Sequence, residues 1–185
     1  IPDALSAAGR DPDRLPPEDL AAVDEFHLGG RAATAALAAD LALAPDERVL
    51  DLGCGIGGPA RYLAAAHGCR VSAIDLTEAF VHTAEALTRR CGLADRASFR
   101  RASALALPFA DGTFDAATLI HVGMNIADKA TLFREVLRVL RPAGRFGVYD
   151  LMRVGDGTIV LLVLWATTEE TSFVATVEEY RRLLG

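Results

Sequence analysis

The stretch Val49–Gly58 reads Val-Leu-Asp-Leu-Gly-Cys-Gly-Ile-Gly-Gly, and it decides the fold of this chain. A short apolar segment ends in Asp51 and Leu52, four glycines follow closely, and Pro59 opens a segment with helical periodicity. Glycine suits such a loop because a residue without Cβ adopts positive φ and lets a ligand approach the backbone. The N-terminus of the following helix presents unpaired N–H groups, which suit a carboxylate or a phosphate. The stretch therefore predicts a site for a nucleotide-like ligand that is anionic in part.

Two classes of ligand fit the glycine spacing. Gly53, Gly55 and Gly58 satisfy the G-x-G-x-x-G pattern of dinucleotide-binding folds, and Asp75 lies 22 residues after Gly53, near the distance for a ribose-binding acid. Asp51 favours a different ligand, because a carboxylate at the mouth of the first strand repels a pyrophosphate and attracts an ammonium or a sulfonium. S-adenosylmethionine carries both of these cations beside an adenosine, so we expect this cofactor.

Composition and charge narrow the class of protein. The 185 residues, 51% apolar and 24% charged, suit one domain with a substantial core. The formal net charge is −6 and no basic cluster exceeds an arginine pair, so we expect no nucleic-acid partner. The longest apolar run, Ile159–Ala166, is too short to cross a membrane, and no secretory signal opens the chain. Because the first residue is Ile1, an N-terminal piece is expected to be missing.

The cysteines indicate the compartment. Cys54, Cys69 and Cys91 lack the spacing of a metal site, and their odd number argues against a disulfide framework. We therefore expect a cytoplasmic protein that binds neither a metal nor a membrane.

The order of elements predicts a doubly wound α/β fold. From Arg48 onward, strand patterns alternate with helical periodicity, which is typical of a parallel sheet with helices on both faces. Pro142-Ala143-Gly144 predicts the turn into the last of these strands. Residues 1–18 are expected to be an irregular lead-in. We expect strands at residues 48–52, 70–75, 97–102, 115–121 and 144–151, and helices from residue 19, at 31–43, 58–67, 78–91, 128–140 and 177–184.

Further motifs complete the pattern. The segment Ala102–Asp115 reads Ala-Ser-Ala-Leu-Ala-Leu-Pro-Phe-Ala-Asp-Gly-Thr-Phe-Asp, and Arg138–Gly144 reads Arg-Val-Leu-Arg-Pro-Ala-Gly. Together with Asp51–Gly58 and Asp75, in this order, they make the chain resemble the class I S-adenosylmethionine-dependent methyltransferases. The most similar group is the small-molecule one that includes ubiquinone/menaquinone-biosynthesis and sarcosine/dimethylglycine methyltransferases.

The resemblance implies a particular domain organisation. It runs from Asp24 to Leu184 and implies a Rossmann-like sheet of seven strands, so the last two strands are expected to be missing. It also divides the chain into an N-terminal helical lid segment, residues 1–47, and an S-adenosylmethionine-binding Rossmann-like domain, residues 48–185.

The resemblance also assigns residues to S-adenosylmethionine and its product S-adenosylhomocysteine. The glycine loop would contact the methionine part, Asp75 the ribose, and the segment after the third strand the adenine, one face of which Leu76 would cover. Asp75 could instead cap the helix that begins at Glu78. Ser103 departs from the family, which commonly has an acid there; a hydroxyl also accepts the adenine amino bond, but more weakly. The implied cofactor-binding residues are Arg31, Asp51, Gly53, Gly55, Gly57, Asp75, Leu76, Ser103, Ala104 and His121.

Several side chains are candidates for chemistry near the transferable methyl group. His121 ends the fourth strand, and its imidazole could take a proton from an incoming hydroxyl or amine, or it could be a polar wall residue. Arg31 could pair with a carboxylate of the cofactor or substrate, or lie on the surface. His27 is likewise a lid residue or a surface histidine. Tyr149 and Asp150, which end the fifth strand, are expected to border the substrate pocket.

Three functions remain open from the sequence. The leading one is an enzyme that transfers a methyl group to an N, O or C nucleophile of a small molecule, and Asp51 with the later motifs favours it. The second is a nicotinamide-dependent oxidoreductase that uses the same glycine loop. The third is a non-catalytic cofactor-binding module. Trp165 and Met152 are expected to be packing residues.

Overall fold

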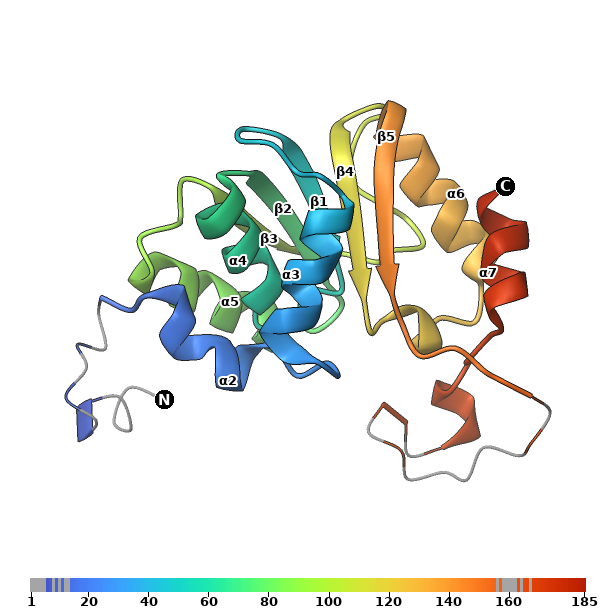
Figure 1. Cartoon of the computed structure of the whole chain (residues 1–185), viewed down its shortest axis with the longest axis horizontal. Coiled ribbons are helices and arrows are strands. Elements are labelled where there is room, and N and C mark those ends of the chain that lie inside the picture. Colours follow the sequence, from blue (N-terminus) through green and yellow to red (C-terminus); the bar gives the residue numbers. More distant parts are fainter. Residues whose placement is uncertain are drawn as a thin grey trace.

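The computed structural model describes residues 6–7, 9, 11, 14–155, 157, 163, 165–166 and 168–185. Within them, five parallel strands form one sheet that helices cover on both faces (Figure 1). The predicted doubly wound α/β fold is confirmed, and the first two strands have the predicted boundaries. The strands are β1 (Arg48–Leu52), β2 (Arg70–Asp75), β3 (Ala97–Arg101), β4 (Phe114–Ile120) and β5 (Leu140–Tyr149).

The strand order β3-β2-β1-β4-β5 positions the functional site. The chain builds the sheet outward from β1 to β3 and then returns to the other side of β1 as β4. In an open parallel sheet, ligands bind beyond the carboxyl ends of the strands at such a reversal. Asp51 near the end of β1 and His121 just after β4 lie at this point.

The start of β5 differs from the prediction. Leu140 already pairs with β4, and the register then shifts before Arg145 resumes the pairing. Between them, Ala143 has a φ of 64°, the left-handed conformation of a tight turn. The turn predicted at Pro142-Ala143-Gly144 is therefore present, but it interrupts the strand instead of preceding it.

The helices lie close to their predicted positions. Asp128 caps α6 by accepting a bond from Thr131 N at 2.9 Å, and Thr176 caps α7 in the same way. Helix α3 ends before the predicted Leu43, and Ala42 just beyond it has a φ of 47°. The helices are α2 (Ala21–Asp24), α3 (Gly30–Asp40), α4 (Gly58–His67), α5 (Glu78–Arg90), α6 (Lys129–Val139) and α7 (Val177–Leu184), with 3₁₀ turns at Pro17–Leu20, Gly123–Asn125 and Glu169–Thr171.

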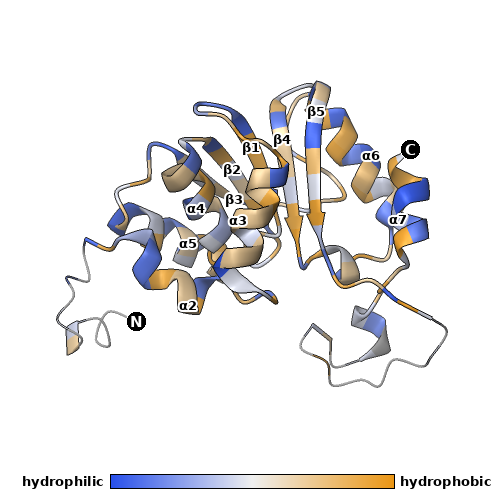
Figure 2. Cartoon of the chain, viewed as in Figure 1, coloured by the Kyte–Doolittle hydropathy of each residue, from blue (hydrophilic) through white to orange (hydrophobic). Residues whose placement is uncertain are grey.

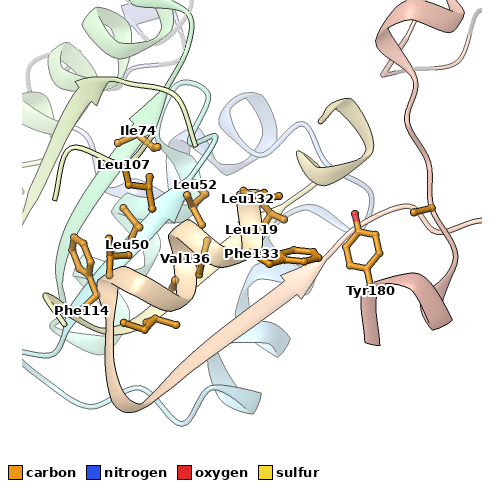
Figure 3. Packing of buried hydrophobic residues seen from close by; sticks show 14 residues of the cluster. Leu50, Leu52, Ile74, Leu107, Phe114, Leu119, Leu132, Phe133, Val136 and Tyr180 are labelled. Carbon is orange, nitrogen blue, oxygen red and sulfur yellow. The ribbon is translucent and has the colours of Figure 1, made fainter. Parts of the chain in front are cut away.

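Alternation along β1 builds two cores. Leu50 and Leu52 belong to a buried cluster that includes side chains of α6 and α7 (Figure 3). Val49 belongs to a second cluster on the opposite face, with alanines of α3 and α4. Because successive side chains of a strand point to opposite faces, Asp51 lies on the face of Val49, beneath the N-terminal helices.

The distribution of polarity fits this layering. Apolar residues are concentrated in the central strands, whereas hydrophilic residues are prominent on the outer helix α7 (Figure 2). Among the residues that the structure describes, no helix combines the length and the apolar character that crossing a bilayer demands.

Candidate functional site

A cavity of about 840 Å³ opens at the carboxyl ends of β1, β2 and β4. Eight of the ten residues implied as cofactor-binding line it, and two, Gly57 and Arg31, do not. The N-terminal segment closes one side of the cavity, and Trp165, expected to be a packing residue, also lines it. Met152 packs against the α6 core as expected. The wall comes from residues 26–28, 53–56, 74–77, 102–105 and 120–128 apart from Gly123, with Asp24, Asp51, Pro59, Phe80, Leu151 and Trp165.

The glycine loop serves the ligand and the protein at different positions. Gly55 has a φ of 53°, and a Cβ there would meet nothing within 4 Å, so its backbone is open to a ligand. A Cβ on Gly57 would lie 2.8 Å from Arg61 Nη1, and one on Gly58 would lie 2.3 Å from Asp24 O. Gly57, implied as a cofactor contact, therefore makes room for a buried arginine, and it does not line the cavity.

Asp51 is a buried carboxylate with one free oxygen. Asp51 is only 2% exposed, and the Thr118 hydroxyl on the neighbouring strand donates to its Oδ1 at 2.9 Å. Oδ2 has no partner among the described residues. Burial raises the Asp51 pKa to about 6, although the Thr118 hydrogen bond acts in the opposite direction. A buried, unpartnered carboxylate oxygen in a cavity wall suits a cationic group of a ligand.

Asp75 connects the end of β2 to the glycine loop. Its Oδ2 accepts a bond from Gly55 N at 3.0 Å, and its Oδ1 accepts one from Thr77 N at 2.8 Å. The alternative that Asp75 caps α5 is wrong, because Thr77 is the N-cap residue of that helix. Asp75 thus fixes the backbone of Gly55 while its carboxylate lines the cavity.

The other end of the cavity is apolar and exposed. Leu76 is 68% exposed, and Phe80 and Leu105 also leave much of their surface in solvent along the cavity wall. Ser103 Oγ accepts a bond from Leu105 N at 3.1 Å, which shapes the turn after β3. The hydroxyl proton and the second lone pair of Ser103 remain for a ligand, beside Ala104.

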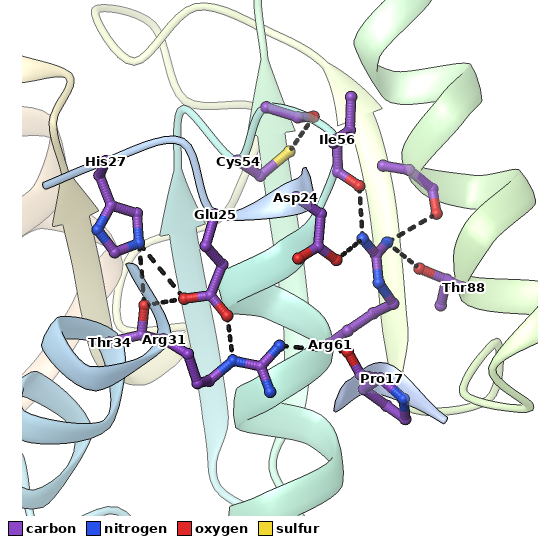
Figure 4. Close-up of polar contacts among 12 residues, drawn as sticks. Pro17, Asp24, Glu25, His27, Arg31, Thr34, Cys54, Ile56, Arg61 and Thr88 are labelled. Atoms are coloured by element: carbon purple, nitrogen blue, oxygen red, sulfur yellow. Dashed lines mark hydrogen bonds and ion pairs between the residues drawn. The ribbon is translucent and has the colours of Figure 1, made fainter. Parts of the chain in front are cut away.

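The Arg31 guanidinium interacts with other side chains of the protein. Its Nε donates to Glu25 Oε1 (Figure 4). Its guanidinium lies 4.9 Å from the centre of the Tyr62 ring. The expected pairing of Arg31 with a ligand carboxylate is not what the structure shows, because Glu25 already occupies this role. Burial alone would raise the Glu25 pKa, but hydrogen bonds from His27, Thr34 and Arg31 lower it overall.

His27 is a wall residue and not a surface histidine. Its side chain is 6% exposed and lines the cavity. Nε2 lies 3.1 Å from Thr34 Oγ1 and 3.4 Å from Glu25 Oε2 (Figure 4). Nδ1 lies 3.2 Å from Leu28 O. Burial acts to lower the His27 pKa, but the hydrogen bonds to Glu25 and Leu28 and the charges of Glu25 and Asp51 raise it overall.

His121 lies where β4 leaves the sheet. It has a φ of 54°, uncommon for a residue with a side chain, and its N–H donates to Tyr149 O at 2.8 Å. The ring stacks on Tyr149 with centroids 5.5 Å apart and an interplanar angle of 24°. Burial lowers the His121 pKa and the charge of His27 acts in the same direction, whereas Asp150 opposes them. A neutral imidazole in a cavity wall can accept a proton.

A buried ion pair between Arg61 and Asp24 lies beneath the glycine loop, and the sequence did not predict it. Arg61 on α4 is fully buried and donates to Asp24 Oδ2 at 2.6 Å and to Ile56 O at 2.8 Å (Figure 4). It also reaches Thr88 on α5 at 3.1 Å. The only signal in the sequence is a charged residue on the otherwise apolar face of α4. This pair holds the N-terminal segment, the glycine loop and α5 together.

Within the described ranges, no group of three or more His, Cys, Asp or Glu side chains could hold a metal ion.

Comparison with protein families gives a match over the central part of the chain. The family described as a methyltransferase domain matches residues 50–148. The methyltransferase GfsG of Streptomyces halstedii is 35% identical over 134 residues, which are 72% of this chain and 48% of that protein. The chain thus spans about half the length, or less, of the curated relatives it matches.

Solved structures have the same fold. The [4+2]-cyclase SpnF matches with a TM-score of 0.73 and 29% identity, over 82% of this chain and 54% of that one. Phosphoethanolamine N-methyltransferase 2 of Haemonchus contortus, in complex with S-adenosyl-L-methionine, matches with a TM-score of 0.79 over 88% of this chain and 37% of that one. Its identity of 23% supports a shared fold only.

Proposed function

Since this chain belongs to the class I S-adenosylmethionine-dependent methyltransferases, we propose that its cavity binds S-adenosylmethionine and that it methylates an N, O or C nucleophile of a small molecule. The observation that carries the proposal is Asp51, whose unpartnered buried Oδ2 lies in the wall of a cavity that also contains the open backbone of Gly55. A pyrophosphate would be repelled there, whereas an ammonium would supply the missing partner.

Each cofactor part has residues of matching chemistry. Asp51 and the backbone of Gly53 and Gly55 would hold the methionine part. Asp75 has carboxylate lone pairs left after its two backbone bonds, and these would accept from the ribose hydroxyls. The exposed Leu76 would cover the adenine, beside Ser103 and Ala104.

His121 is the proposed proton acceptor. The bound cofactor would supply a methyl group that is already activated as part of a sulfonium, so alignment of the acceptor contributes much of the rate. The protein then has to remove one proton when the nucleophile is a hydroxyl or a neutral amine. The neutral ring of His121 lines the cavity and takes this proton.

The acceptor side of the cavity favours an apolar molecule. Beyond His121 the wall is formed largely by apolar side chains, which would bury hydrocarbon surface of an acceptor. Residues 26–28 of the N-terminal segment also belong to this wall, which supports a lid role for residues 1–47. The apolar side chains are Phe26, Leu28, Val122, Met124, Ile126 and Leu151.

The setting proposed for this reaction is the cytoplasm. The three cysteines are free, which fits a reducing compartment. The net charge of −6 gives a nucleic-acid partner no support.

One specific observation favours a second function. SpnF has this fold and is named for a [4+2] cyclisation, so a chain of this fold can carry out a reaction other than methyl transfer. The cavity would then hold the same cofactor without using its methyl group. The comparisons offer no support for the nicotinamide-dependent alternative.

Two measurements test the proposal in sequence. Calorimetric titration with S-adenosylhomocysteine should show binding, and NADH should show none. Turnover of methyl-labelled S-adenosylmethionine against a panel of apolar phenols, enols and amines should then transfer label to at least one acceptor. Binding without any transfer would favour the second function, and binding of NADH alone would overturn both.

A further inference from the structure

His27 lies between a buried polar network and the proposed base. On one side it contacts Glu25, Thr34 and the carbonyl of Leu28. On the other, its ring centroid lies 5.8 Å from that of His121, and 6.2 Å from that of Tyr149. Apart from His27 and His121, no histidine among the described residues lines the cavity.

The network fixes the protons of His27. Glu25 is held ionised by Arg31, and Thr34 donates its only hydroxyl proton to Glu25 Oε2 at 2.5 Å. Thr34 Oγ1 can therefore only accept from His27 Nε2, at 3.1 Å. The carbonyl of Leu28 can likewise only accept, so Nδ1 also bears a proton. An imidazole with protons on both nitrogens is a cation.

We propose that His27 is a fixed imidazolium whose charge, together with burial, favours the neutral form of His121, the form that accepts the acceptor's proton. The proposal rests on the proposed function, in which His121 is the base. His27 is a positioning residue, because both of its N–H groups are used by the protein and it acts on the reaction only through His121.

The charges around both rings support this assignment. The pKa of His27 is raised, since its bonds to Glu25 and Leu28 outweigh the effect of burial, and Asp51 adds to them. The pKa of His121 is lowered by burial first and by the charge of His27 as well. Asp150 at the end of β5 opposes this lowering with a larger effect than that of His27, although Tyr180 Oη donates to Asp150 Oδ2 at 2.7 Å.

The proposal gives the N-terminal segment a chemical role. Asp24, Glu25 and His27 belong to one short stretch that α3 and α4 hold in place through Thr34 and Arg61. This stretch therefore places the positive charge of His27 beside His121.

Proton NMR titration of the free protein tests the proposal without cofactor or acceptor. The chain has four histidines, His27, His67, His82 and His121, so each imidazole C2–H signal can be assigned by single substitution to glutamine. His27 should titrate above the ordinary value of about 6.5 and His121 below it. In the His27→Gln variant, the pKa of His121 should rise by roughly 0.5 to 2, the range that a unit charge at this distance gives between water-like and protein-like dielectric.

A second variant and a control make the result decisive. Glu25→Gln removes the carboxylate charge beside Nε2 and should lower the pKa of His27 and raise that of His121. His82→Gln, on the exposed face of α5, should change neither. An unchanged His121 pKa in folded His27→Gln protein would overturn the proposal, as would a His27 that titrates at or below about 6.5 in the unsubstituted chain. A lack of methyl transfer would contradict the proposed function alone, because this titration needs no turnover.

Discussion

Replacing Asp51 with asparagine should stabilise the free protein and weaken its affinity for S-adenosylhomocysteine. The Asp51 carboxyl is buried with Oδ2 unpartnered, and burial raises its pKa from 3.8 to about 6. The folded chain therefore holds this proton more tightly than the unfolded chain, and the free energy of unfolding falls as pH rises between about 4 and 6. At neutral pH the ionised group destabilises the fold by about 3 kcal/mol. Asparagine removes this charge and keeps an oxygen that Thr118 can donate to.

The effect on binding has the opposite sign. An ammonium beside the Asp51 carboxylate restores its missing partner, so the ligand binds the ionised form. Protonation of Asp51 should therefore raise the Kd of S-adenosylhomocysteine by about tenfold between pH 7.5 and pH 5. The Asp51→Asn variant should bind more weakly at pH 7.5 and lose this part of the pH dependence.

Two assays measure these effects. Thermal unfolding of the free proteins at pH 7.5 should give a higher Tm for the variant, at about 2–4 °C per kcal/mol for a chain of this size. Calorimetry at three pH values gives the Kd. Asp128→Asn is the matched control, because Asp128 also lines the cavity but is exposed, and asparagine caps helices equally well. An Asp51→Asn variant of unchanged or lower Tm that binds as tightly as the unsubstituted chain would refute the reasoning.

Three further substitutions separate the parts of the site. Asp75→Ala should weaken the binding of S-adenosylhomocysteine by about 1.5–3 kcal/mol, because it removes bonds to the ribose hydroxyls and leaves Gly55 N without its acceptor. Unchanged affinity by calorimetry would mean that Asp75 has a structural role only. Ser103→Asp should tighten binding, since a carboxylate can keep the bond from Leu105 N and accept more strongly from the adenine; weaker binding would contradict the assignment. His121→Ala should lower kcat by about 100-fold with cofactor affinity nearly unchanged, and the rate of the unsubstituted enzyme should fall as pH drops through the His121 pKa. A variant that loses only acceptor affinity would identify a wall residue.

Local sequence determined the elements that build the site. The boundaries of β1, β2 and α4 could be predicted because alternation, helical periodicity and glycine punctuation are properties of neighbouring residues. The strand ends then placed Asp51, Asp75 and the segment at Ser103 on one edge, since the carboxyl ends of parallel strands meet there. The start of β5 was missed because Leu140 joins the sheet through pairing with distant Phe114.

Only the tertiary structure decided the partners of the polar residues. For both Arg31 and His27 the sequence left a role at the site and a place on the surface open. The structure pairs Arg31 with Glu25 outside the cavity lining, whereas His27 lines the cavity. Gly57 looked like a ligand contact and makes room for Arg61. Arg61 finds Asp24 across 37 residues of chain, and Asp51 finds Thr118 across 67. A motif specifies the backbone that a residue adopts, but the charge and hydrogen bonds of a buried side chain depend on whichever distant groups the fold brings against it.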